Sequence, residues 1–392
     1  MRSTIDKEDK GLIPFFKKTP ISIKKGDGVF VWDEDGKKYI DLTSGWGVTS
    51  IGHSNRAIVK ALLTQGSKII QNPNSGLTYS PERAKLLDVL LPILPKNLTK
   101  LFFANSGAEA NDASMKLARK ITQKRNIVSM SGSFHGRTIG SVSATAQDAH
   151  QKKFNPLMPN HQYIPFDNIT ALKSVIKNDI AAVIVEPIQG EGGVNIPAKN
   201  YLKNVSTICK ENGVLLIVDE VQTGFYRTGK AFCSQDIEAD FLTMAKGIAG
   251  GFPFGGFAVS EEIASQIELG DHGGTYCGNP LGCAVACAVV DFMVKNSIWQ
   301  NVEKTGNFAR ATIKSWQKKY PKKIVSTRGK GLLLAVEFED GLVDKIQERA
   351  LENGLIINVN KGKNIRIFPA LTITHDEMKV ALEILEKSFG WR

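Results

Sequence analysis

One lysine of the sequence is placed where covalent chemistry is possible. Lys246 follows an apolar run in "TMAKGIAGGFPFGG", residues 243–256, and precedes a glycine-rich loop. A lysine after a strand is most often solvated. In an apolar site, however, the ammonium form is disfavoured and the amine becomes nucleophilic. Such an amine can form a Schiff base, so Lys246 is a candidate for attaching an aldehyde cofactor.

One carboxylate stands at the end of an apolar run. In "LLIVDEVQTGFYRTGKAF", residues 215–232, aliphatic residues lead directly into Asp219 and Glu220. One interpretation is a strand that ends in an ordinary turn, because Asp and Gly are common turn residues. The other places Asp219 at the carboxyl end of a parallel strand, where open α/β sheets bind ligands. This stretch alone does not separate the two interpretations.

A third stretch has the pattern of a phosphate site. "NSGAEANDASMKLARK", residues 105–120, follows a short strand and opens an amphipathic helix. Ser106, Gly107 and Ala108 would form its first turn. There the free backbone N–H groups and the helix dipole attract phosphate, and glycine permits close approach. Taken alone, the same residues favour an ordinary Ser-Gly helix cap over a phosphate site.

Pyridoxal phosphate requires these three parts together. Its phosphate suits a helix N-terminus, its aldehyde condenses with a lysine, and its pyridine nitrogen needs a carboxylate to stay protonated. The combination predicts that Asp219 faces the ring nitrogen and that Gln222 reaches the ring hydroxyl. This explains why an apolar strand would end in an acidic residue.

The elements that must position these residues are apolar runs that alternate with helical stretches. Runs of this kind are buried on both faces, as in mainly parallel sheets covered by helices. They predict an α/β fold with a large three-layer domain over residues 45–285. The runs are "KLFFANSG", "NIVSMSGSF", "AAVIVEPIQG", "VLLIVDEV", "FLTMAKG" and "FGGFAVS".

The two ends of the chain differ from this pattern. Residues 1–44 are predicted to form an arm and a hairpin, "GVFVWDEDGKKYIDL", with Asp35-Gly36 as the turn. Residues 286–392 are predicted to form a smaller α+β domain with a "GKGLLLAVEF" strand and a strand pair near 355–368. Its last helix is marked by Thr374 and Glu377 at capping-box spacing. The N-terminal arm is expected to pack with this smaller domain.

The composition indicates a soluble globular protein. The chain has 392 residues, of which 42% are hydrophobic and 23% charged, and it begins with a polar stretch rather than a signal peptide. No apolar window approaches the length needed to span a bilayer, so we expect a cytoplasmic protein without a membrane partner. Five cysteines without a C-x-x-C pair predict reduced thiols and no metal site.

The net charge of +11 raises the question of a nucleic-acid partner. Residues 304–330 contain nine Lys or Arg and no Asp or Glu. An apolar stripe at Ala309, Ile313, Trp316 and Tyr320 predicts one helix with a basic outer face. Clustered positive charge can bind phosphate backbones, but no nucleic-acid motif accompanies it. We therefore interpret the segment as a solvated helix face and expect no nucleic-acid partner.

At this point the chain resembles the class III, fold-type I pyridoxal-phosphate aminotransferases, and within them most closely acetylornithine aminotransferases. The resemblance runs from about residue 13 to residue 390. It rests on an ordered set of motifs rather than on any one of them. These are "VWDEDGKKYIDL", "NSGAEAN", "FHGRT", "VEPIQGEGG", "DEVQTG", "AKG" before "AGGFP", "GGTYCGNPL" and "IRIFPAL".

The resemblance implies roles at the cofactor. Lys246 corresponds to the Schiff-base lysine, which also moves the proton, and Asp219 to the partner of the pyridine nitrogen. Val221 and Phe134 would cover the two ring faces. The remaining cofactor contacts that it implies are Gln222 at the ring oxygen, the cradle of Ser106, Gly107 and Ala108, and Thr275 at the phosphate of the neighbouring subunit. It thus implies a homodimer with shared active sites.

The resemblance also implies substrate contacts. Arg366 in "IRIFPAL" would bind the α-carboxylate of glutamate or 2-oxoglutarate, because a guanidinium fork fits a carboxylate. Glu191 would cover Arg366 while an ω-amine reacts, and Arg137 would hold the distal carboxylate of the substrate. Trp46 and Gly274 are expected to line the substrate pocket.

Three of these positions depart from the family pattern. Trp46 replaces a small aliphatic residue, Gly274 replaces a Ser or Thr, and Phe16 stands where ornithine aminotransferases have a tyrosine. Changes of this size can redirect specificity without changing the chemistry. The loss of the tyrosine hydroxyl argues against free ornithine.

The implied reaction moves the terminal amino group of N2-acetylornithine to 2-oxoglutarate and gives N-acetylglutamate 5-semialdehyde and glutamate, a step of arginine biosynthesis. One alternative keeps the chemistry and changes the ω-amine to 4-aminobutyrate, succinyl-diaminopimelate, ornithine or lysine. A second is a decarboxylase, racemase or aminomutase on the same fold. A third is a non-catalytic protein that binds through the basic face of residues 304–330.

Overall fold

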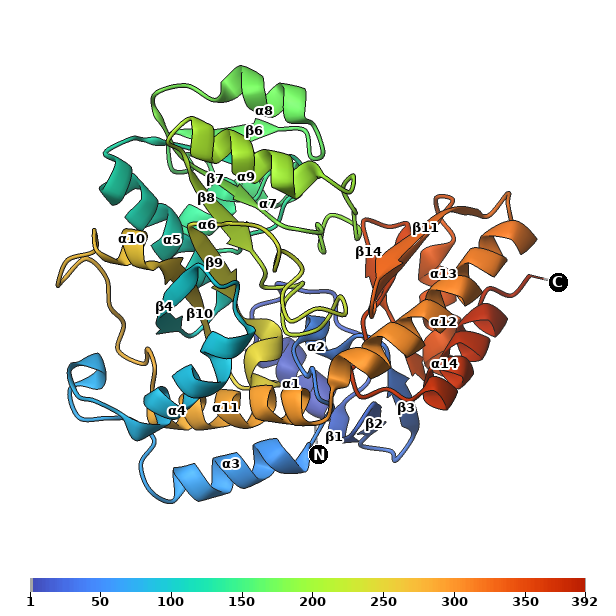
Figure 1. The fold of residues 1–392 in the computed structure, drawn as a ribbon. Helices are drawn as coiled ribbons and strands as arrows, with labels where there is room; N and C mark the ends of the chain where they lie inside the picture. The colour runs from blue at the N-terminus through green and yellow to red at the C-terminus, as the bar shows by residue number, and fades with distance from the viewer. Residues whose placement is uncertain (1–2, 392) are drawn as a thin grey trace.

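A seven-stranded sheet forms the core of the larger part of the protein in the computed structural model, which describes residues 3–391 (Figure 1). The strand order is β4-β10-β9-β8-β7-β5-β6. The strands are β4 (Leu98–Ala104), β5 (Asn126–Met130), β6 (His161–Ile164), β7 (Ile180–Val185), β8 (Leu215–Asp219), β9 (Phe241–Met244) and β10 (Gly255–Ser260).

Only β10 runs against its neighbours in this sheet. It pairs antiparallel with β4 and β9, whereas β6, β5, β7, β8 and β9 pair in parallel. The sheet is therefore mainly parallel, as predicted, and each of the six apolar runs forms one of its strands. The edge strand β6 was not predicted, because "HQYI" lacks the continuous apolar character of the others.

The sheet is covered on both faces, which makes the three layers. Along β7, Val183 and Val185 belong to the core that includes Val205 and Ile208, whereas Ala182 and Ile184 belong to a second core. Successive side chains of a strand point to opposite faces, so one strand supplies both cores. The first core packs under α8 (Ile169–Val175) and α9 (Tyr201–Glu211), and the second under α5 (Gly107–Thr122).

A second, antiparallel sheet is built by the C-terminal part of the chain, with the order β11-β12-β15-β14. The predicted "GKGLLLAVEF" strand is β12, but β11 was not predicted. Its strands are β11 (Ile324–Lys330), β12 (Leu333–Phe338), β14 (Asn358–Asn360) and β15 (Asn364–Ile367). The helices beside it are α12 (Ile298–Lys319), α13 (Val343–Glu352) and α14 (His375–Ser388), the last with the predicted capping box at Thr374 and Glu377.

A third sheet joins the two ends of the chain. The hairpin predicted around Asp35-Gly36 is present and leads from β2 into β3. Parallel to β3 lies the short strand β13, which comes from the C-terminal part. The order is β1 (Ile23–Asp27), β2 (Phe30–Asp33), β3 (Lys38–Asp41) and β13 (Leu355–Ile356).

The remaining helices connect or flank these sheets. The helical stretches predicted near residues 56–70 and 82–94 are α3 and α4. α3 and α4 lie against α11. The helices are α1 (Thr4–Gly11), α2 (Ser44–Gly47), α3 (Arg56–Gly66), α4 (Pro81–Leu90), α6 (Ile139–Ala144), α7 (Asp148–Gln151), α10 (Glu261–Ala264) and α11 (Pro280–Lys295).

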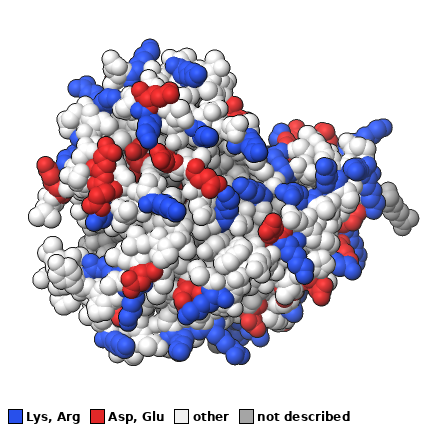
Figure 2. All heavy atoms as spheres, in the orientation of Figure 1, with Lys and Arg blue, Asp and Glu red and all other residues white. Residues whose placement is uncertain are grey.

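The basic segment of residues 304–330 is not one helix face, and that prediction was wrong. Ala309, Ile313 and Trp316 are buried on α12 as expected, but the helix ends at Lys319 and the chain turns into β11. The helix ends there because Pro321 follows, and proline disfavours helical backbone at the residue before it. Figure 2 shows Lys and Arg on this part of the surface interspersed with Asp and Glu. Arg328, for example, pairs with Glu337 at 2.7 Å.

Within residues 3–391, no single helix is long and apolar enough to cross a membrane. The helix pair Pro280–Lys295 and Ile298–Lys319, bent by 69°, passes the same test of length and composition when taken together. Much of this pair is core: Val285, Val289 and Val302 are fully buried against the rest of the chain.

Candidate active site

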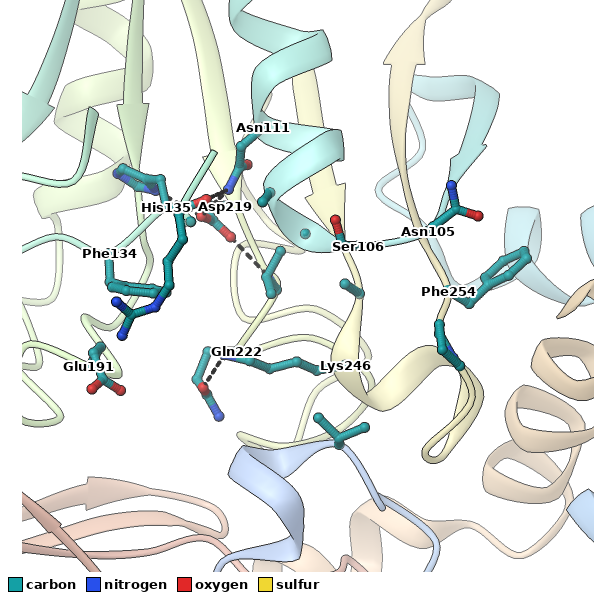
Figure 3. Close-up of a pocket in the computed structure, with 18 of the residues that line it drawn as sticks. Asn105, Ser106, Asn111, Phe134, His135, Glu191, Asp219, Gln222, Lys246 and Phe254 are labelled. Carbon is teal, nitrogen blue, oxygen red and sulfur yellow. Dashed lines mark hydrogen bonds and ion pairs between the residues drawn. The ribbon is translucent and has the colours of Figure 1, made fainter. Parts of the chain in front are cut away.

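The carboxyl ends of five strands meet at one edge of the large sheet and build a cavity of about 480 Å³ (Figure 3). Because β4, β5, β7, β8 and β9 run in the same direction, the residues that follow them come together there. Ten residues expected at the site line this cavity: Ser106, Gly107, Ala108, Phe134, Arg137, Glu191, Asp219, Val221, Gln222 and Lys246.

Asp219 is the last residue of β8, and its carboxylate is held by three donors. Oδ2 accepts hydrogen bonds from Asn111 Nδ2 at 2.8 Å and lies 2.8 Å from His135 Nδ1, while Oδ1 accepts from the backbone N–H of Val221 at 3.0 Å. The side chain is buried. These three contacts bind both carboxylate oxygens and fix the direction of the buried side chain.

Lys246 lies two residues beyond the end of β9, and its amine points into the cavity toward Gln222 (Figure 3). Nζ donates to Gln222 Oε1 at 2.5 Å. Burial lowers the pKa of Lys246, and the negative charges of Glu191 and Asp219 partly oppose that effect. The residue has φ 45°, a conformation that non-glycine residues rarely adopt and that recurs at functional sites.

The N-terminus of α5 opens on the same cavity. Ser106 caps the helix, and its Oγ accepts from the backbone N–H of Glu109 at 3.2 Å. A Cβ atom on Gly107 would lie 2.8 Å from the side chain of Val221, so only glycine fits here. The unpaired N–H groups of this first turn are available to an anion.

Phe134 and Arg137 belong to the loop after β5. The guanidinium of Arg137 lies over the Phe134 ring, 5.5 Å from its centre, and His150 contacts the same ring edge-on. The backbone N–H of Phe134 donates to Glu186 Oε2 at 3.0 Å. Arg137 is exposed, so its charge faces the opening of the cavity.

Arg366 lies behind Glu191 at the junction with the C-terminal sheet. Nη1 of Arg366 is 2.7 Å from Glu191 Oε2 and also donates to the carbonyl of Gly190 at 3.1 Å. The Arg366 side chain is 3% exposed and that of Glu191 is 33% exposed. Burial lowers the pKa of Arg366, which the adjacent Glu191 carboxylate counteracts. Moving Glu191 aside would uncover the guanidinium.

Four expected residues do not line this cavity: Arg366, which lies behind Glu191, and Gly274, Thr275 and Trp46. Gly274 and Thr275 are exposed and line a separate hollow of about 1000 Å³ with Leu77, Tyr79 and Leu269. A Cβ atom on Gly274 would lie 2.2 Å from Cys277 Sγ.

Trp46 is also exposed, and its ring centre is 6.1 Å from that of Phe16. Its carbonyl accepts from Gln222 Nε2 at 3.5 Å, so its backbone does reach the site.

Three buried polar residues of the site were not predicted. His135 and Asn111 hold Asp219, and the Oδ1 atom of Asn111 accepts from Thr243 Oγ1 at 2.7 Å. Glu186 follows β7 and is almost fully buried, and burial raises its pKa to about 7. All three lie within motifs quoted above: His135 in "FHGRT", Glu186 in "VEPIQGEGG" and Asn111 at the end of "NSGAEAN". Only the fold reveals which of these side chains point inward.

The arrangement fits pyridoxal phosphate on the chemistry of its side chains. A lysine amine with a lowered pKa, a buried strand-end carboxylate and an open helix N-terminus surround one cavity. Gly107 leaves the close backbone approach that a phosphate group needs. The donors and acceptors thus match an aldehyde, a pyridine nitrogen and a phosphate.

Comparison with known proteins gives the class. The family pattern of the class-III aminotransferases matches residues 16–389, and the chain belongs to this family. It is 39% identical over 383 residues to the acetylornithine aminotransferase of Methanothermobacter thermautotrophicus, with 97% of each chain covered. It is 38% identical over 377 residues to the acetylornithine aminotransferase of Methanopyrus kandleri, with 95% of each covered.

Solved structures agree in fold. The ornithine aminotransferase from Toxoplasma gondii superimposes with a TM-score of 0.94 at 28% identity, covering 98% of this chain and 94% of that one. The acetylornithine aminotransferase from Elizabethkingia anophelis gives 0.87 at 33% identity, covering 98% and 97%. The protein is therefore a class III aminotransferase that depends on pyridoxal phosphate, on the fold-type I architecture expected from the sequence.

Proposed function

We propose that the protein transfers the terminal amino group of N2-acetylornithine to 2-oxoglutarate, giving N-acetylglutamate 5-semialdehyde and glutamate. The names of the relatives at 38–39% identity support this donor. The observation that carries the two-substrate reaction is the ion pair of Arg366 with Glu191 beside the cavity. A covered arginine suits an enzyme that must accept an ω-amine in one half-reaction and an α-carboxylate in the other.

Residues of the cavity would hold the cofactor. Lys246 would bind the aldehyde carbon, Asp219 the ring nitrogen and Gln222 the ring oxygen. Val221 and Phe134 would cover the ring faces, and the backbone of Ser106, Gly107 and Ala108 would bind the phosphate. When bound, pyridoxal phosphate supplies an electron sink that stabilises negative charge on the substrate carbon.

Lys246 would act as the acid and base of the reaction. Its Nζ, as a neutral amine, would take a proton from the substrate carbon and later give one back as the acid. A pKa lowered by burial favours the neutral amine that this requires. Asp219, whose carboxylate is bound by Asn111, His135 and the backbone of Val221, would face the ring nitrogen.

Arg366 and Arg137 would recognise the carboxylates. With Glu191 in place, the charge of Arg366 is paired. Arg366 then does not bind the carboxylate of an ω-amine substrate. With Glu191 moved, Arg366 would bind the α-carboxylate of 2-oxoglutarate as a fork. Arg137, at the opening of the cavity, would bind the distal carboxylate.

Trp46, Gly274 and Phe16 differ from the family pattern, and these differences favour considering a second amino donor. Trp46 and Phe16 form an exposed aromatic pair next to the backbone that contacts Gln222. The alternative function is therefore the same reaction with 4-aminobutyrate, succinyl-diaminopimelate, ornithine or lysine as donor.

We further propose a homodimer in which Thr275 reaches the phosphate of the partner's site. The position of Thr275 away from the Lys246 cavity supports this, as does the exposure of Leu77, Tyr79 and Leu269 beside it. Three units are also proposed: an N-terminal arm and hairpin (1–44), a cofactor domain (45–285) and a C-terminal domain (286–392). The mass measured by sedimentation would test the dimer, and a monomeric holoenzyme with full activity would contradict it.

The test of the function is an absorbance titration of the purified holoenzyme. N2-acetylornithine should abolish the visible band of the bound cofactor at lower concentration than ornithine or 4-aminobutyrate, and 2-oxoglutarate should restore it. Lys246→Ala is the control, and it should show neither the loss of the band with an amine nor its return with 2-oxoglutarate. Loss of the band with another amine alone would reassign the donor, and no response to any ω-amine would reject the proposal.

A further inference from the structure

The hairpin of β14 and β15 presents a polar face to the loop that carries Glu191. Asn358 pairs with Arg366 across the hairpin and Asn360 pairs with Asn364. Because side chains alternate along a strand, residues 358 and 360 share one face with their partners 364 and 366. All four are buried or half-buried, although buried positions are usually occupied by apolar residues.

Each member of this face has a separate contact. Arg366 Nε donates to Asn358 Oδ1 at 2.8 Å, which fixes the plane of the guanidinium. Asn364 Oδ1 accepts from Arg328 Nη2 at 2.9 Å, and Arg328 Nε in turn donates to the carbonyl of Gly193 at 2.8 Å. These contacts hold the loop and the arginine, but none of them touches the Glu191 carboxylate.

Asn360 makes the contact that involves Glu191 itself. Its Nδ2 donates to the Glu191 carbonyl at 2.9 Å and to Glu191 Oε1 at 3.1 Å. The other carboxylate oxygen, Oε2, is the one paired with Arg366. One amide thus holds both the backbone and the side chain of Glu191, and the two carboxylate oxygens are bound by different residues. Asn360 is 7% exposed, so water competes little for these bonds.

We propose that Asn360 is a positioning residue that keeps Glu191 on Arg366 and so sets how readily Arg366 is uncovered. The inference rests on the proposed function, because it assigns Glu191 and Arg366 to the two half-reactions. Uncovering Arg366 breaks the bond from Asn360 to Oε1 as well as the ion pair. Asn360 therefore favours the half-reaction of the ω-amine and opposes binding of an α-carboxylate.

The first test uses glutarate, a dicarboxylate that cannot react. Its Kd is measured by calorimetry on the holoenzyme and on Asn360→Leu, which keeps the size of the side chain and removes the donor. The variant should bind glutarate about tenfold more tightly, the effect of releasing one hydrogen bond to a carboxylate. Asn364→Leu, a buried asparagine of the same hairpin without contact to Glu191, should not gain affinity.

The second test compares half-reactions in single turnovers. In Asn360→Leu, the ratio of apparent affinities for 2-oxoglutarate and the ω-amine should rise about tenfold, whereas a structural defect would weaken both equally. Equal glutarate affinity in Asn360→Leu and wild type, or the same gain in Asn364→Leu, would overturn the inference. Should Asn360→Leu not fold, Asn360→Ala, which also lacks a side-chain donor, is measured in the same way with the same outcomes.

The two proposals fail differently. If wild type binds glutarate but responds to no ω-amine, the proposed function is wrong, while the glutarate comparison still decides the role of Asn360. If wild type transaminates and Asn360→Leu changes neither Kd nor ratio, only the role of Asn360 is wrong.

Discussion

The carboxylate of Asp219 and the imidazole of His135 contact each other in the interior, with Oδ2 2.8 Å from Nδ1 and both side chains buried. The other ring nitrogen, Nε2, has no hydrogen-bond partner among the described residues. His135 thus directs its one polar contact at Asp219. Asn111 binds the same oxygen from α5, so the carboxylate is held from two elements.

Replacement of His135 should weaken the action of Asp219. His135→Phe removes a hydrogen bond to a charged group, and kcat should fall about 10–100-fold, the effect of losing about 1.5–3 kcal/mol. His135→Asn can place an amide donor near the position of Nδ1 and should recover much of the loss. Steady-state kinetics and the pH dependence of the visible cofactor band measure both variants. If Phe and Asn behave alike, the contact with Asp219 is not what matters.

Replacement of Lys246 should separate cofactor binding from attachment. In Lys246→Ala, turnover should fall by at least about 10³-fold, because the covalent anchor and the general base are both lost. After borohydride treatment and denaturation, mass spectrometry should find the cofactor on the wild type and not on the variant. Lys230→Ala, at an exposed surface lysine, is the matched control and should keep both the label and the activity. A labelled Lys246→Ala chain would place the attachment elsewhere.

Glu186 should make stability depend on pH. Its pKa is raised to about 7 by burial, so the folded protein holds a proton that the unfolded chain releases above about pH 4.5. Folded protein binds more protons between these values, and the free energy of unfolding therefore falls as pH rises from 4.5 to 7. The contribution is on the order of 3 kcal/mol for a fully buried group.

Urea unfolding of the cofactor-free protein at several pH values measures this. Glu186→Gln cannot ionise, so its stability relative to wild type should increase steadily from pH 5 to pH 7. A difference that does not change with pH over this range would show that Glu186 is already ionised in the folded protein.

Arg227 should matter for stability rather than for chemistry. Its guanidinium is buried, it donates to the carbonyls of Leu332 and Pro369, and no carboxylate pairs with it among the described residues. Burial lowers its pKa to about 9. Arg227→Ala leaves a cavity and two buried carbonyls without a donor, so the free energy of unfolding should fall by about 2–5 kcal/mol.

Urea denaturation gives this value, with Arg125→Ala as the control because Arg125 is an exposed arginine. The KM values of the folded Arg227→Ala enzyme should stay within about twofold of wild type. A large change in KM with unchanged stability would mean that Arg227 acts on the substrate site instead.

The sequence was sufficient for the elements with a strong local pattern. Each fully apolar run became a strand of the large sheet, because such a run has no stable place other than between two layers. β6 and β11 were not predicted because they lack an apolar run. "HQYI" and "IVSTRGK" are edge strands with mixed polar and apolar side chains. The basic stretch of residues 304–330 spans a helix and a strand, because Pro321 ends the helix before the chain enters β11.

The site was predictable where one residue type has one chemical use. Lys246 and Asp219 meet in the structure as their chemistry required. His135, Asn111 and Asn360 were missed because an amide or imidazole has many uses, and its partner is fixed only by tertiary contact. Asn360 illustrates the limit, since its partner Glu191 is 169 residues away along the chain.

The pairing of β13 with β3 joins the two ends of the chain, and Lys37 Nζ donates to the carbonyl of Leu351 across 314 residues of sequence. During synthesis the N-terminal hairpin leaves the ribosome long before β13, the last strand of this sheet, has been made. Until then, the edge of β3 has unpaired N–H and C=O groups that any other extended segment can occupy. Folding of this sheet must therefore be post-translational, and a nascent chain arrested before Leu355 should be more prone to aggregate than the released protein.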